Sequence, residues 1–91
     1  MHRTISITVS GRVQGVYYRQ STKEKARQLG ITGWVKNRAD GCVLIAATGS
    51  ENQLNELVEW CKQGPPRAQV TSVQVEPADP QVFDNFTIQH G

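Results

Sequence analysis

The hydrophobic period along this chain changes twice from two residues to about 3.6 residues and back, which limits the fold to strands alternating with helices. Ile5–Ser10 alternates apolar and polar side chains, as a half-buried strand does. Tyr18–Leu29 is rich in Lys, Glu, Gln and Ala and contains neither Gly nor Pro, so it predicts a helix that Gly30 ends as a left-handed cap. Its inner face is expected to carry Tyr18, Thr22, Ala26 and Leu29.

The middle of the chain predicts two strands joined by a tight turn. Ile31–Lys36 reads as the first of these strands, and Asn37–Gly41 is a turn signal with Asp-Gly at its centre. Cys42–Thr48 is almost continuously apolar, so we expect it to lie centrally in the sheet, with Gly49 at its end.

A second helix begins at the clearest start signal in the chain. Ser50 can accept the amide of Gln53 while the Gln53 side chain reaches back, which is a capping box. An apolar stripe at helical spacing follows, formed by Leu54, Leu57, Val58 and Cys61. Gly64–Pro66 is expected to end this helix because a proline cannot continue it.

The last part of the chain predicts two further strands. Gln69–Glu76 forms the first, and its alternation slips between Val70 and Val73, so we expect a bulge or a late strand start there. Pro77–Pro80 is expected to be a loop. Phe86–Ile88 is expected to form a short final strand.

The resulting order is strand, helix, strand, strand, helix, strand and a short terminal strand. This order predicts an α+β, ferredoxin-like sandwich with two helices on one face of a mostly antiparallel sheet. A length of 91 residues suits one domain, expected to span residues 1–91. Enzymes, RNA-binding modules and ligand sensors all use this architecture, so the function has to be argued from particular residues.

Composition excludes several classes of partner. The formal charge is +2 with Lys and Arg spread among acids, so no nucleic-acid partner is expected, whereas a small anionic ligand is compatible. No apolar run is long enough for a signal peptide or a membrane span, so we expect a cytoplasmic protein with no membrane partner. Cys42 and Cys61 are expected to be buried thiols, with neither a zinc site nor a disulfide.

Gly11–Arg19 is the segment in which chemistry is most strongly indicated. A predicted strand leads through a glycine-containing loop into a helix start, where the first amides lack intrahelical partners and the dipole is positive. Gly15 would let the backbone approach a ligand closely. Arg19 opposes the helix dipole, which makes sense if an anion is to lie between the guanidinium and the amides. A tight turn beside a solvated arginine fits these residues equally well.

Asn37, at the end of the second predicted strand, is the other candidate, although an arbitrary Asn there is more often a turn residue. His2 and His90 lie near the ends of the chain, where fraying is expected. No Asp, Glu and His cluster has metal-ligand spacing, and no Ser-His or Cys-His pair is evident. Any hydrolysis by this chain would therefore proceed without a metal, a nucleophile or a strong general base.

Two motifs in register resemble the signatures of the acylphosphatase family. Gly11–Arg19 is similar to the first signature, which reads G-R-V-Q-G-V, one variable residue, an aromatic and Arg. Gly33–Asn37 resembles the second signature, which reads Gly, an aromatic, a small apolar residue, a polar residue and Asn. The spacing between the two also fits, and the resemblance extends over nearly the whole chain.

The resemblance implies the hydrolysis of the carboxyl–phosphate bond of acyl phosphates to a carboxylate and inorganic phosphate. It implies that Arg19 binds the phosphate and that Asn37 orients the attacking water. It further implies a monomer without cofactor or metal, and a site that accepts inorganic phosphate or sulfate as a ligand. Tyr17 replaces a frequent Gly, and Arg38 replaces a Thr of some members. The phosphate cradle would be the backbone amides of Gln14, Gly15, Val16, Tyr17 and Tyr18.

Two other functions compete with this enzyme. The first is a binding module that holds an acyl or carbamoyl phosphate without hydrolysing it, although the presence of both Arg19 and Asn37 in a chain of this length argues against it. The second is an RNA-binding module, which would need exposed aromatic residues on the central strands. The strand segments Ile5–Ser10 and Cys42–Thr48 contain none.

Overall fold

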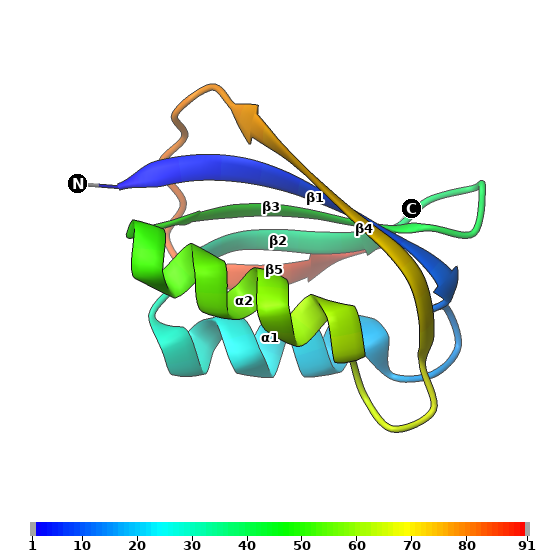
Figure 1. Cartoon of the computed structure of the whole chain (residues 1–91). Helices are drawn as coiled ribbons and strands as arrows, with labels where there is room; N and C mark the ends of the chain where they lie inside the picture. The colour runs from blue at the N-terminus through cyan, green and yellow to red at the C-terminus, as the bar shows by residue number, and fades with distance from the viewer. Residues whose placement is uncertain (1, 91) are drawn as a thin grey trace.

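The computed structural model describes residues 2–90, so Met1 and Gly91 of the expected 1–91 domain lie outside the described residues. Seven elements follow one another in the order expected from the sequence (Figure 1). They are β1 (Arg3–Arg12), α1 (Tyr18–Leu29), β2 (Thr32–Asn37), β3 (Val43–Gly49), α2 (Glu51–Gln63), β4 (Gln69–Ala78) and β5 (Phe86–Gln89).

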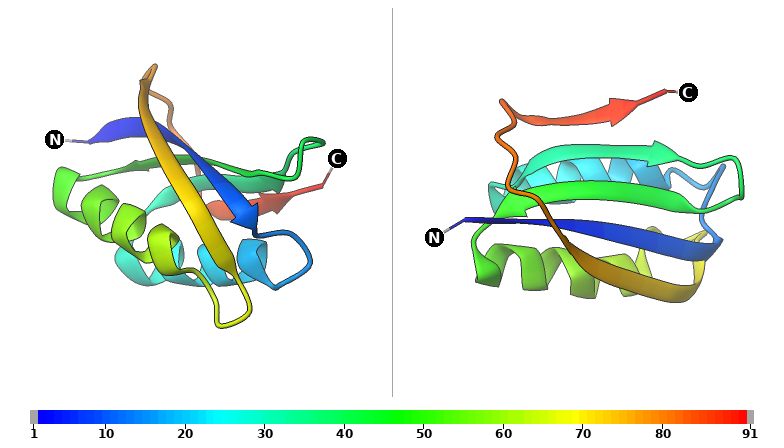
Figure 2. Two further views of the ribbon diagram at one scale, coloured as in Figure 1. Left: turned by 45° about the vertical axis from the view of Figure 1, so that its right-hand side comes forward. Right: turned by 90° about the horizontal axis from the view of Figure 1, so that it is seen from above.

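The five strands form one sheet in the order β4-β1-β3-β2-β5. All neighbouring pairs are antiparallel except β2 and β5, which run parallel. Both helices pack against the same face of the sheet, as Figures 1 and 2 show. The predicted ferredoxin-like sandwich is therefore confirmed, and β3 lies centrally between β1 and β2, as its apolar run indicates.

The core lies between the sheet and the helices, and the period-two pattern of the strands builds the sheet side of it. Ile7, Val9 and Ile45 are completely buried on this face. The expected helix faces are also confirmed, since the buried residues are Tyr18, Thr22 and Ala26 in α1 and Leu54, Leu57 and Cys61 in α2. Leu29 and Val58 are partly buried against the same core.

Local start and stop signals agree closely with the structure. The Ser50 hydroxyl accepts the amide of Gln53 at 3.2 Å, and Oε1 of Gln53 accepts the amide of Ser50 at 2.8 Å. Gly30 ends α1 in the left-handed region, as expected. The start of α2 and the end of α1 are therefore set by the residues at those two positions.

Two strand ends and the burial of Cys42 differ most from the sequence-based expectations. Gly11 and Arg12, expected in a loop, extend β1 by pairing with β4 beyond a register shift, which is the bulge indicated by the slipped alternation. Pro77, also expected in a loop, pairs with Ile5 in β4. A proline is tolerated there because β4 is an edge strand, where one row of amides needs no partner. Cys42 is half-buried rather than buried, because it lies at the mouth of the hairpin.

The strand directions bring one end of several elements together. Because β1 and β2 are both antiparallel to β3, they run parallel to each other and end at the same edge of the sheet. β5 runs parallel to β2 and ends there too, and α1 begins there after the loop of residues 13–17 that follows β1 (Figure 2). Segments distant in sequence therefore meet at this edge.

Candidate active site

The loop of residues 13–17 is anchored by two apolar side chains and leaves its backbone open between them. Val13 and Val16 are buried in the core. Gly15, between them, has φ 75°, and a Cβ placed there would meet nothing within 4 Å. The backbone at Gly15 therefore faces open space, as a position that a ligand approaches closely requires.

The start of α1 has no stabilising partner of its own. Tyr17 occupies the cap position with φ 65°, its side chain accepts no capping hydrogen bond, and the first turn holds no acidic residue. The first helical hydrogen bond runs from the Ser21 amide to the Tyr17 carbonyl at 3.0 Å. Within residues 2–90, the amides from Gln14 to Tyr18 donate to no protein acceptor. These amides and the helix dipole are available to an anion.

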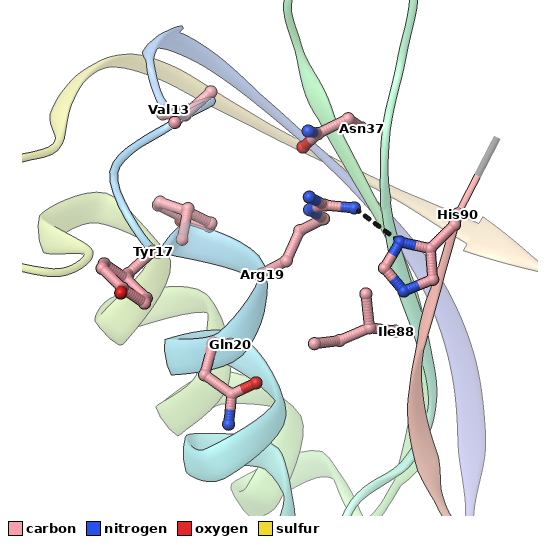
Figure 3. Close-up of a pocket in the computed structure, with 9 residues that line it drawn as sticks. Val13, Tyr17, Arg19, Gln20, Asn37, Ile88 and His90 are labelled. Atoms are coloured by element: carbon pink, nitrogen blue, oxygen red, sulfur yellow. Dashed lines mark hydrogen bonds between the residues drawn. The ribbon is translucent and has the colours of Figure 1, made fainter.

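A pocket of about 420 Å³ opens above this loop and contains both polar side chains that the sequence singled out. Arg19 extends from the first turn of α1 toward Asn37, the last residue of β2 (Figure 3). The lining is formed by Val13, Gly15, Tyr17, Tyr18, Arg19, Gln20, Asn37, Ile88 and His90. Arg19 and Asn37 therefore line one pocket, because β1 and β2 end at the same edge of the sheet.

The Asn37 side chain has an oxygen without a partner. Its Oδ1 atom is buried and accepts no hydrogen bond from any residue that the structure describes. A buried acceptor left unpaired costs about 1–3 kcal/mol, so such an atom in a folded protein calls for an explanation. A donor that arrives with the substrate, such as a water molecule, would satisfy it.

The Gln14 side chain ties the loop to the turn that follows Asn37. Its Nε2 atom donates to the carbonyls of Arg38 and Cys42 at 2.8 and 2.9 Å. Asp40 closes the same turn by accepting the Cys42 amide and pairing with Arg38 at 2.8 Å. The hydrogen bond from the Cys42 backbone, followed by the Arg38 charge, lowers the pKa of Asp40. Sequence reasoning assigned only the backbone amide of Gln14 and missed this bridge.

His90 also lines the pocket, although its place near the chain end favoured fraying. Its Nδ1 atom lies 3.5 Å from Nη1 of Arg19 (Figure 3). The signal that could have found it is the period-two run of Phe86, Ile88 and His90, which places all three on the helix-facing side.

Tyr18 packs rather than reacts. Its ring is buried, and its hydroxyl donates to the Cys61 carbonyl at 2.8 Å, away from the opening of the pocket. Burial, followed by the neighbouring Cys61, raises the pKa of this phenol far above its usual range. The hydroxyl of Tyr18 is therefore engaged in packing α1 against α2.

Comparison with known proteins agrees with the motifs. The sequence model of the acylphosphatase family matches residues 5–88, which is nearly the whole chain. The chain belongs to the acylphosphatase family. The family's reaction is the hydrolysis of acyl phosphates, so the protein is a hydrolase acting on an acid anhydride.

Curated acylphosphatases resemble this chain along its length. The acylphosphatase of Marinobacter nauticus is 54% identical over 86 residues, which cover 92% of each chain. That of Haloarcula marismortui is 44% identical over 88 residues, covering 97% of each chain. The family resemblance drawn from the two motifs is therefore confirmed.

Solved acylphosphatase structures share the whole fold. The enzyme from Coxiella burnetii superposes with a TM-score of 0.94 at 40% identity, covering 97% of this chain and 93% of the other. The enzyme from Bacillus subtilis gives 0.92 at 40% identity, covering 98% and 99%.

Residues 2–90 contain no group of three or more His, Cys, Asp or Glu side chains placed to hold a metal ion. No helix among them is long and apolar enough to cross a membrane.

Proposed function

We propose that Arg19, Asn37 and the amides from Gln14 to Tyr18 form the catalytic site of this acylphosphatase, and that the site needs no metal. The observation that carries the proposal is the unpaired, buried Oδ1 of Asn37 in the pocket that Arg19 enters. One cation, a row of free amides and one unpaired acceptor match the needs of phosphoryl transfer to water.

Arg19 and the loop amides would hold the phosphoryl group. Phosphoryl transfer passes through a loose transition state with charge on the equatorial oxygens, so catalysis depends mainly on positioning and electrostatics. The guanidinium offers two parallel donors to two oxygens, and the amides need no reorganisation during the reaction. The hydrogen bonds from the guanidinium and the amides are strongest in the transition state, where negative charge accumulates on the phosphoryl oxygens.

Asn37 would orient the attacking water, because Oδ1 can accept a hydrogen bond from that water. This bond would fix the direction of the lone pair on the water oxygen. The water oxygen bonds to phosphorus while the bond between phosphorus and the acyl oxygen breaks. The carboxylate leaves with the bonding electron pair, and the excess proton of the water passes to phosphate or solvent. Since a carboxylate is a weak base, its departure requires little protonation by a general acid.

Hydrolysis of benzoyl phosphate in excess chelator tests the whole proposal. The unaltered protein should turn over, and metal removal should leave the rate unchanged. Arg19→Gln and Asn37→Ala should each lower kcat by about 10²–10³-fold or more, as loss of a fixed transition-state partner does. Arg3→Gln and Asn52→Ala are matched controls, because these exposed residues lie outside the pocket, and they should keep full activity.

Phosphate affinity separates the two roles. Arg19→Gln should bind inorganic phosphate or sulfate weakly, whereas Asn37→Ala should bind it as the unaltered protein does. A large loss of phosphate binding in Asn37→Ala would contradict the water-orienting role. Binding of phosphate without any turnover would instead indicate a module that holds acyl phosphates.

We also propose that this acylphosphatase acts as a monomer in the cytoplasm and that residues 1–91 form one domain. All proposed site residues come from a single chain, which supports a monomer. Light scattering should then give one chain's mass, 10.1 kDa, at concentrations at which the enzyme is active.

A further inference from the structure

His90 directly follows the end of the parallel pair of β2 and β5. The last paired residues are Lys36 and Gln89, and the chain continues from them to Asn37 in β2 and to His90 after β5. Alternation along β5 turns His90 toward the helices, like the buried Phe86. His90 therefore enters the same pocket as Arg19 and Asn37 (Figure 3).

The contact between Arg19 and His90 depends on the protonation of the imidazole. Arginine has donors only, so Nδ1 of His90 must accept the bond from Nη1 at 3.5 Å, which requires a neutral ring with its proton on Nε2. A protonated ring offers no acceptor and places a second cation against the guanidinium.

Between residues 2 and 90, the residues that line the pocket provide no negative charge. Among the pocket residues, α1 contributes Arg19 and the neutral Gln20, β2 contributes the neutral Asn37, and the loop contributes the phenol of Tyr17. Lys36 alternates to the helix-free face, where it lies 5.3 Å from the ring of Trp34. No carboxylate lines the pocket within residues 2–90. A bound dianion would add the negative charge that these lining residues lack.

We propose that His90 is a second cationic ligand of the substrate phosphate and takes up a proton as the anion binds. The inference rests on the proposed function, because it requires the phosphate to lie at Arg19. An anion between the two side chains turns their repulsion into two attractions, and the imidazolium adds a charge-assisted hydrogen bond. Histidine is suited to this role because it titrates near neutral pH.

Sulfate is the probe, because it stays a dianion across the range in which histidine titrates, whereas phosphate does not. Calorimetric titrations of the whole protein with sulfate at pH 5.5 and pH 8.0 should give an affinity about tenfold higher at the lower pH. Repeating them near pH 7 in two buffers with different ionisation enthalpies should reveal proton uptake on binding.

Three variants isolate His90. His90→Asn should bind sulfate weakly at both pH values and take up no proton, and His90→Lys should bind tightly at both because its charge is retained. His2→Asn is the matched control: it removes the other histidine, which precedes β1 at the end remote from the pocket, and should keep the parent's pH dependence. With benzoyl phosphate, His90→Asn should lower kcat/KM several-fold at pH 5.5 and change it much less at pH 8.0.

Two results would overturn the role of His90: equal sulfate affinity of the parent at both pH values, or an unchanged pH dependence in His90→Asn. Failure of the proposed function would look different. In that case Arg19→Gln would bind sulfate as tightly as the parent at every pH, whatever the His90 variants did.

Discussion

Tyr17 shows how a single residue at this site departs from what stability favours. Its φ of 65° lies in the left-handed region, which costs a residue with a side chain about 1–2 kcal/mol. Its ring is 79% exposed, so packing returns little of that cost. Strain of this kind is typical of functional sites, which agrees with the phosphate-binding role proposed for this loop.

The substitution Tyr17→Gly is expected to stabilise the protein. Glycine adopts the left-handed conformation freely but loses more entropy on folding, so the free energy of unfolding should rise by about 0.5–1 kcal/mol. Urea denaturation of the parent and the variant measures this difference in the free energy of unfolding. Tyr17→Ala is the control, since it removes the ring but keeps the Cβ; an equal gain there would show that the ring, and not the backbone, is the source.

At the scale of elements, the N-terminus of α1 and the C-terminus of α2 are joined by one hydroxyl. The Cys61 carbonyl would ordinarily accept the amide four residues later, but that residue is Pro65, which has none. The Tyr18 hydroxyl takes its place at 2.8 Å. Gly64 is required beside it, because a Cβ there would come within 2.6 Å of the Tyr18 ring. The helix that carries Arg19 is thereby held against α2.

Tyr18→Phe is expected to destabilise the fold, because it leaves the Cys61 carbonyl buried without a donor. The free energy of unfolding should fall by about 1–3 kcal/mol. Chemical denaturation measures the change, with Tyr17→Phe as the matched control: it removes a hydroxyl from an exposed ring and should have little effect. Similar losses in the two variants would refute the proposed bridge between the helices.

Gln14 links two other elements, the loop before α1 and the turn between β2 and β3. Gln14→Ala breaks both hydrogen bonds to the turn and should let Asn37 shift relative to Arg19. We expect kcat to fall by about 10–100-fold, while phosphate affinity, which depends on Arg19 and the amides, changes little. Steady-state kinetics with benzoyl phosphate and phosphate titration provide the two readings.

The isosteric Gln14→Glu should be as impaired as Gln14→Ala, because a carboxylate cannot donate to the two carbonyls. Gln28→Ala, at an exposed position of α1, should behave like the parent. Full kcat in Gln14→Glu would mean that the bridge does not position Asn37.

At the scale of the whole molecule, the buried ionisable groups set how stability varies with pH. Burial raises the pKa of the Cys61 thiol to about 12, and the pKa of Tyr18 is raised as well. Groups with raised pKa values hold more protons when folded than when unfolded at alkaline pH. Their contribution to the free energy of unfolding is complete below the unfolded-state pKa. It is lost as the pH rises toward the folded-state pKa.

The free energy of unfolding should therefore be flat near neutral pH and decrease above about pH 9, by up to about 1.4 kcal/mol per pH unit for each such group. Urea denaturation between pH 7 and 11 measures the slope. Cys61→Ala should lower stability at pH 7 through the cavity it leaves, yet show a shallower alkaline decline, because one of the two buried groups is gone. A parent protein equally stable at pH 7 and pH 11 would contradict this account.

The sequence alone determined what depends on a few neighbouring residues: the span of α1, the capping box of α2, its end at Gly64–Pro66, and the two motifs that indicated the family. It could not determine where β4 would pair Pro77, since only an edge position tolerates that residue. Nor could it bring Arg19, Asn37 and His90 into one pocket. Their meeting depends on β1 and β2 both pairing with β3, and on β5 joining β2 in parallel. These contacts join residues far apart in sequence, so only the tertiary structure could decide them.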